Sequence, residues 1–217
     1  MKVLSKIDGG EIISTREYDV AYNGDIKEGA IVKVAAGKAV KAAQGETGAI
    51  LGVAAETHKG VEDALNVRAD GTKLMVCDAD VVMACDAPIV AATGGSATTV
   101  TASTLGAYAN DDWNGGYLVL VEKADGSTNT DKIGTVKEIT DYAYASSGTV
   151  STFTVATGGT ANDGAKYALF PPTGLAKGYL SSDATAWGVT GVTCTSLKVV
   201  GRDIEAGLVT FKAASKF

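Results

Sequence analysis

Residues 24–57 read GDIKEGAIVKVAAGKAVKAAQGETGAILGVAAET, and this stretch decides the class of fold. Its apolar residues come in short runs of strand length, and no run continues at the spacing of an amphipathic helix. The runs are Ile31–Val34, Ala39–Ala42 and Ile50–Ala55. Glycines between and within the runs supply tight turns or bulges, which let short strands curl into a closed barrel without exposed edges. These glycines are Gly29, Gly37, Gly48 and Gly52.

The rest of the chain repeats this pattern of short runs rich in Val, Ile and Thr, separated by Gly, Asn, Asp or Ser. Further strands are predicted at Lys73–Val76, Val81–Ala84, Tyr117–Glu122, Ile133–Ile139, Thr149–Val155, Ala165–Phe170, Thr193–Val200 and Leu208–Lys212. Only His58–Ala69 has the composition of a helical turn or two, and a polar loop is the alternative there. The sequence therefore predicts an all-β fold, built as a small β-barrel or sandwich.

Composition divides the chain into four parts. Residues 1–24 mix charges with isolated apolar side chains, which predicts an extended arm that docks on a neighbouring subunit and whose removal leaves the fold intact. Residues 25–90 are predicted to form the β-barrel domain. Residues 91–112 are rich in Ala, Thr, Ser and Gly and almost free of charge, which predicts a low-complexity linker. Residues 113–217 are predicted to form a second β-rich domain.

A weak internal echo connects the two ends of the chain. Asp25–Ala36 (DIKEGAIVKVAA) and Asp203–Ala214 (DIEAGLVTFKAA) share Asp-Ile, a Gly four residues after the Asp, and a closing Ala-Ala. Chance similarity in a chain rich in Ala and Gly is one explanation. The other is a shared turn-then-strand unit, in which case the last strand returns to the first barrel and the second domain is an insertion.

Bulk composition excludes several classes of partner. The chain has 217 residues, long enough to bury a core without metal ions or disulfides, and its 27 Gly against 3 Pro indicate many turns. A formal net charge of −6 without any basic run argues against a nucleic-acid partner. The N-terminal residues lack the apolar run of a secretory signal, and no stretch approaches the ~20 apolar residues that span a bilayer. We therefore predict no membrane partner and synthesis in a cytoplasm.

No catalytic constellation is evident. The single histidine, His58, lies in the polar stretch AAETHKGVED, and no G-x-S-x-G motif supplies a nucleophile. Acidic pairs fall in turn-like positions, where Asp makes local hydrogen bonds, and no acidic run has the spacing of a calcium loop. The pairs are Glu62-Asp63, Asp78-Asp80 and Asp111-Asp112. Three cysteines, Cys77, Cys85 and Cys194, lack metal-ligand spacing. We therefore predict no enzyme, no cofactor and no metal.

Several large apolar and aromatic side chains are candidates for binding a partner protein. In the arm, large apolar and aromatic residues are predicted to contact a partner, and the two tryptophans are predicted to be half-buried anchors at a loop base or an interface. The predicted contact residues are Ile12, Ile13, Tyr18, Tyr22, Trp113 and Trp187. For the two tryptophans, stacking on a sugar is the alternative.

The deciding stretch also resembles the small β-barrel of the capsid decoration, or cement, proteins of tailed phages. That family opens with G-x-(I/V)-x-x-G-x-(I/V)-V, followed by a glycine-turned hairpin and a strand of the form (I/V)-(I/L)-G-V-A. The matching residues here are Gly24, Ile26, Gly29, Ile31 and Val32, then Gly37, then Ile50–Ala54. The long second half, from Trp113 on, has no counterpart in the short members of the family.

The resemblance implies a trimer on the capsid exterior, at or near three-fold positions, where it binds subunits of the major capsid protein and resists internal pressure. We accordingly predict a virion structural protein of the capsid surface. Another β-rich virion component, a tail tube or a fibre, is the nearest alternative. A carbohydrate-binding module is the alternative from a different class, and a hydrolase with two facing carboxylates is the remaining one.

Overall fold

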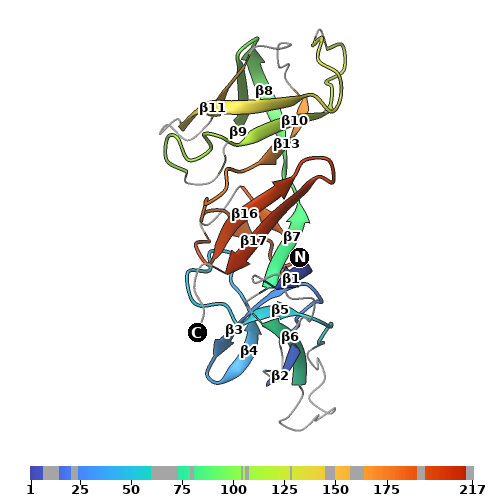
Figure 1. The fold of residues 1–217 in the computed structure, drawn as a ribbon, viewed down its shortest axis with the longest axis vertical. Coiled ribbons are helices and arrows are strands. Elements are labelled where there is room, and N and C mark those ends of the chain that lie inside the picture. The colour runs from blue at the N-terminus through green and yellow to red at the C-terminus, as the bar shows by residue number, and fades with distance from the viewer. Residues whose placement is uncertain are drawn as a thin grey trace.

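Every element of the described chain is a β-strand, which confirms the all-β class predicted from the sequence. The computed structural model describes residues 1–6, 15–20, 24–59, 73–78, 81–103, 105, 108–127, 129–144, 150–156, 164–189 and 194–213. Its strands form a lower sheet, a middle sheet and a barrel, stacked along the long axis of the molecule (Figure 1).

The lower sheet contains most of the stretch that opened the sequence argument. Its order is β2-β6-β5-β3-β4. The bounds are β2 (Thr15–Asp19), β3 (Ile31–Ala35), β4 (Lys38–Lys41), β5 (Gly52–Ala54) and β6 (Lys73–Asp78). The sheet curls until its two outer strands meet at one parallel bridge, between Val20 and Ala39. Gly52 permits the close pairing of β5 with β6, because a Cβ atom there would overlap the carbonyl oxygen of Cys77.

The middle sheet brings the two ends of the chain together. Its order is β1-β7-β17-β16, and all of its pairs are antiparallel. The bounds are β1 (Lys2–Lys6), β7 (Val81–Asp86), β16 (Leu197–Asp203) and β17 (Leu208–Ala213). A two-stranded ribbon of β14 (Tyr179–Leu180) and β15 (Trp187–Gly188) packs beneath it, since Trp187 contacts Phe211 of β17.

The barrel is formed by consecutive residues between β7 and β14. Its closed order is β10-β11-β12-β9-β8-β13. The bounds are β8 (Ile89–Ser96), β9 (Thr99–Ser103), β10 (Tyr117–Glu122), β11 (Val136–Tyr144), β12 (Val150–Val155) and β13 (Lys166–Phe170). The two long strands turn its corners: β8 pairs first with β13 and then with β9, and β11 first with β10 and then with β12. Each turns at a bulge, because an extra residue bends the strand.

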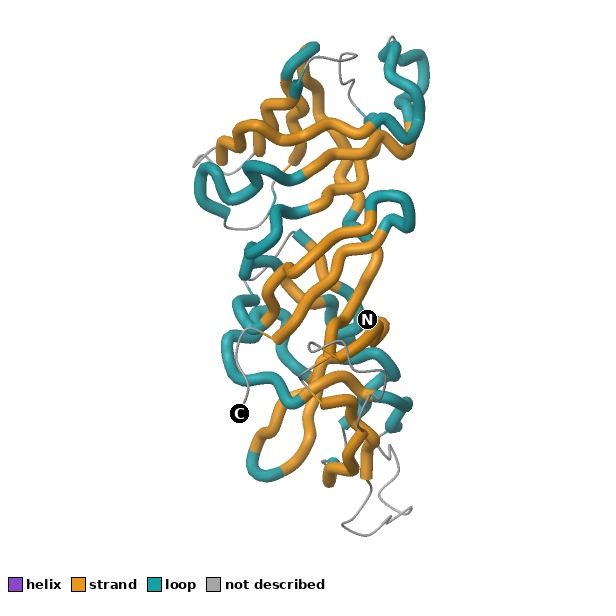
Figure 2. The backbone as a smooth tube through the Cα atoms, in the orientation of Figure 1, coloured by secondary structure: helices purple, strands orange, loops and turns teal. Residues whose placement is uncertain are grey.

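A chain of aromatic rings joins the barrel to the middle sheet. The ring centroids of Trp113 and Trp187 are 6.4 Å apart, and those of Trp187 and Phe211 are 5.1 Å apart. Arg202 of β16 adds a polar link, because its guanidinium lies 4.3 Å from the ring centroid of Tyr117 on β10. One continuous core therefore runs through all three units, as the trace in Figure 2 allows the reader to follow.

The predicted arm is corrected to two paired strands. β1 pairs with β7, and β2 pairs with β6, so both belong to the sheets of the protein itself. The prediction was wrong because it judged residues 1–24 by their own weak strand propensity. An edge strand can form with low strand propensity, since the neighbouring strand supplies its hydrogen-bond partners.

The predicted linker and barrel are also corrected. Residues 91–112 contain most of β8 and all of β9, which are barrel strands. Residues 25–90 supply four of the five strands of the curled lower sheet, β7 of the middle sheet and the start of β8, whereas the closed barrel lies at 89–170. The composition of residues 91–112 did not indicate β8 and β9, because Ala, Thr and Gly are common in loops as well as in these strands.

The C-terminal strand does return to the first half of the chain, where β17 pairs with β7. The internal echo is structural as well. Gly29 and Gly207 occupy matching turn positions with φ of +78° and +72°, and a strand follows each. The barrel is thus an insertion between β7 and the elements that lead to the β16–β17 hairpin.

Candidate partner-binding surface

The two tryptophans lie inside the protein. Trp113 is 0% exposed and Trp187 is 4% exposed. The rings of Tyr108 and Phe153 pack edge-on against Trp113. Neither indole offers a face to a partner protein or to a sugar, so their predicted partner-binding role is corrected: they are core anchors that hold the barrel on the middle sheet.

Of the four predicted contact residues in the N-terminal segment, Tyr18 is the one that the structure describes. Ile12, Ile13 and Tyr22 lie outside the described residues. Tyr18 is half-buried on β2. Partial burial and the carboxylate of Asp78 on the neighbouring strand raise the pKa of the Tyr18 hydroxyl, which therefore stays protonated at neutral pH.

Strand β2 is an exposed edge of the lower sheet. It pairs with β6 on one side, and among the described residues its other side meets a strand at one point, the parallel bridge between Val20, just after β2, and Ala39 of β4. Four of its five side chains are exposed, and Tyr18 is the exception. Two ion pairs hold it to β6: Arg16 Nε lies 3.1 Å from Asp78 Oδ2, and Lys73 Nζ lies 3.3 Å from Glu17 Oε2.

The register shows which backbone groups of β2 face outward. The carbonyl oxygen of Met75 on β6 accepts a hydrogen bond from the amide of Ala55, on the β5 side. The polar backbone groups of Met75 are therefore turned away from β2. Glu17 stands directly opposite Met75, so its own N–H and C=O point away from β6, toward the open edge. An extended segment of a partner can pair with such an edge.

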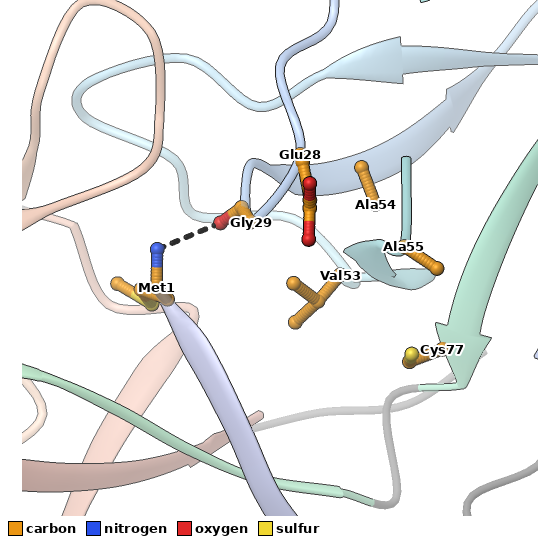
Figure 3. A pocket seen from close by; sticks show the side chains of 7 residues that line it. All are labelled: Met1, Glu28, Gly29, Val53, Ala54, Ala55 and Cys77. Carbon is orange, nitrogen blue, oxygen red and sulfur yellow. Dashed lines mark hydrogen bonds between the residues drawn. The ribbon is translucent and has the colours of Figure 1, made fainter. Parts of the chain in front are cut away.

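A pocket lies between the lower and middle sheets (Figure 3). It has a volume of about 580 Å³. Its described lining residues are Met1, Glu28, Gly29, Val53, Ala54, Ala55 and Cys77. The amino group of Met1 donates to the carbonyl oxygen of Gly29 over 2.9 Å at one side of the pocket. Its position on the seam between β1 and β5 makes it a gap in the packing of two sheets.

The chemistry of this pocket is limited. Burial, and then the carboxylate of Asp78, raise the pKa of the Cys77 thiol, so it remains a protonated and weakly nucleophilic group at neutral pH. His58 lies elsewhere on the lower sheet, where its backbone bridges Ile26. Across the ranges that the structure describes, no three His, Cys, Asp or Glu side chains gather closely enough to hold a metal ion.

Comparison with family models, with curated proteins and with solved structures finds no match. Among the described residues there is also no helix of the length and apolarity needed to cross a membrane.

Proposed function

We propose that this chain is a virion structural protein that decorates the capsid exterior, binds major-capsid-protein subunits as a homo-oligomer, and so stabilises the shell. The observation that carries the proposal is the exposed strand β2 at one end of an elongated stack of β units (Figure 1). The resemblance of residues 24–57 to the decoration proteins falls in the same lower sheet.

The three units of the molecule are held together by one hydrophobic core, which suits attachment to a partner at one end. The barrel, the middle sheet and the lower sheet share one core, so a partner held at the lower sheet is held by the whole molecule. Strand addition at β2 would join the lower sheet to a strand of the capsid protein through backbone hydrogen bonds. A protein that binds the assembled shell in preference to free subunits stabilises the shell by mass action.

The carbohydrate-binding alternative depended on an exposed tryptophan. Both tryptophans are buried, so that alternative has lost its supporting observation. No contact in the described chain favours a tail tube or a fibre over a capsid position.

The test is a binding assay with bare, mature shells. We expect the purified protein to co-sediment with the shells and to raise their resistance to heat. No binding to shells of demonstrated maturity contradicts the proposal.

A pair of variants tests the role of the β2 edge. Glu17→Pro removes the outward N–H while leaving the β2–β6 hydrogen bonds in place, because the N–H of Glu17 faces away from β6. We expect this variant to fold and to lose shell binding. Glu17→Ala is the matched control, since it removes the same side chain and keeps the N–H. Equal shell binding by the two variants contradicts attachment through the edge of β2.

A further inference from the structure

A row of apolar side chains crosses one outer wall of the barrel. The register sets Ile89, Ala168, Val119 and Val136 directly opposite one another on β8, β13, β10 and β11. Residues opposite each other in antiparallel strands share a face of the sheet. The two ends of the row are open to solvent, since Ile89 is 54% exposed and Val136 is 46% exposed, whereas Ala168 and Val119 between them are nearly covered by their neighbours.

Alternation along β10 confirms that this face is the outer one. Leu118 and Leu120 are both 0% exposed and point into the barrel. Val119 therefore points outward, because successive side chains of a strand alternate. The register shifts between Leu120 and Glu122, so Val121 is placed on the outside by its exposure instead. Val121 is 37% exposed, and Ile133, in the turn before β11, is 65% exposed. The apolar wall is defined here as Ile89, Val119, Val121, Ile133, Val136 and Ala168.

The opposite wall of the same barrel has a different composition. There Thr101 lies opposite Thr152, and Thr99 lies opposite Thr154, with Ser96 opposite Thr99 on the next strand. The solvent-facing side chains of this wall therefore carry hydroxyl groups. The apolar wall differs, because four of its large apolar side chains are exposed, and a group of exposed apolar side chains is typical of a protein interface.

Charged residues next to the wall in sequence or register include both signs equally. They are Lys132, Lys166, Glu122 and Glu138. Lys166 Nζ and Glu122 Oε2 lie 2.8 Å apart in an ion pair. The whole chain carries a formal net charge of −6, so this wall is a locally neutral part of an acidic molecule. Two acidic copies repel least where each presents a neutral apolar face, and a strongly charged partner gains nothing there.

We propose that a second copy of this chain covers the apolar wall. The inference rests on the homo-oligomer of the proposed function and names the surface through which copies meet. An interface of this kind has an apolar centre and a polar rim, as the wall and its four bordering charges provide.

The test is sedimentation of the isolated protein over a concentration series. We expect the wild type to sediment at a multiple of the chain mass of 21.9 kDa. Ile89→Asp and Val136→Asp should each shift the protein to the mass of one chain, because each places a charge in the apolar contact. Val200→Asp is the matched control: Val200 is 37% exposed on β16, outside the wall, so this variant should remain oligomeric.

Three results overturn the inference: a monomeric wild type, oligomers that persist in both wall variants, or equal dissociation of the Val200→Asp control. Circular dichroism and thermal melting of each variant verify the fold, and Ile133→Asp, in a turn, replaces any wall variant that unfolds. The shell-binding assay separates the two proposals. A monomeric protein that binds shells overturns this inference, together with the homo-oligomer of the proposed function, but leaves capsid binding standing. An oligomer that ignores shells overturns capsid binding alone.

Discussion

Gly178 lies so close to the indole of Trp187 that a Cβ atom at position 178 would overlap the ring nitrogen. Its φ of +142° is also one that residues with a side chain rarely adopt. We expect Gly178→Ala to lower the free energy of unfolding by at least ~2 kcal/mol, because backbone strain and steric overlap each cost about 1–3 kcal/mol. Urea-induced unfolding measures this loss.

The matched control is Gly174→Ala in the same segment. Gly174 also has a positive φ, of +94°, but the nearest atom to a Cβ there is 3.9 Å away. This variant should lose only the backbone contribution. An equal decrease in the free energy of unfolding for the two variants would show that steric overlap with Trp187 adds nothing at position 178.

Burial of both indoles predicts the fluorescence of the native protein. We expect an emission maximum at short wavelength and almost no quenching by iodide, because neither ring contacts solvent. Unfolding in urea should shift the emission to longer wavelength and expose both rings to iodide. A native protein with one readily quenched tryptophan would reopen the sugar-stacking alternative.

Truncation of the Trp113 side chain should also be costly. We expect Trp113→Ala to lower the free energy of unfolding by about 3–5 kcal/mol, as large buried side chains do. Differential scanning calorimetry measures the change. Because this ring contacts Trp187, the variant should loosen the junction between the barrel and the middle sheet. Val200→Ala, at a residue of β16 that is 37% exposed and lies outside the apolar wall, is the control and should change stability little.

Glu46 makes stability depend on acidity. Burial opposes the charge of this carboxylate, but hydrogen bonds from Lys33 and from the amides of Gly48 and Ala43 outweigh it and lower the pKa. The charged form is therefore favoured in the folded protein. The resulting stability is present in full above the unfolded pKa, about 4.3, and is lost as the pH falls through the lower folded value.

The corresponding variant is Glu46→Gln, which removes the charge and keeps the shape. We expect it to cost about 1–3 kcal/mol at pH 7, as the loss of hydrogen bonds to a charged group does. Urea unfolding at a series of pH values should show this difference shrinking below pH ~4. A difference that stays constant with pH would show that the charge of Glu46 is not responsible.

Deletion of residues 1–22 should now damage the fold. The deletion removes β1 and β2, and so uncovers one side of β7 and one side of β6. We expect the truncated chain to unfold at lower urea concentration or to aggregate, because unpaired strand edges associate with other chains. Circular dichroism and light scattering measure both effects. A truncated chain as stable as the intact one would restore the extended-arm interpretation.

Local patterns predicted the strands that are rich in Val, Ile and Leu. The predicted strand 117–122 coincides with β10, and the prediction for 165–170 differs from β13 by one residue. By contrast, β8 and β9 were missed, although Val100 and Ala102 alternate inward with outward Thr99 and Thr101. The alternation was the available signal. It was overlooked because the residues of these strands, mainly Ala, Thr and Gly, are also typical of loops.

Features that depend on distant pairing could not be predicted. The closed barrel requires β8 to pair with β13 and β13 with β10, and nothing within any one of these strands specifies its partner. The apolar wall has the same origin, because Ile89 and Val136 come together only through those pairings. The full burial of the two tryptophans depends on contacts of the same kind, because Phe153 packs against Trp113 and Phe211 against Trp187.

The position of the barrel has a consequence for how the molecule is made. β7 emerges from the ribosome well before β17, its partner on one side, because all of the barrel strands are translated in between. The middle sheet therefore remains incomplete, with one side of β7 unpaired, until β17 has been synthesised. During that interval the unpaired edge of β7 is exposed to association with other chains, and the hazard ends when β17 docks rather than when the barrel closes.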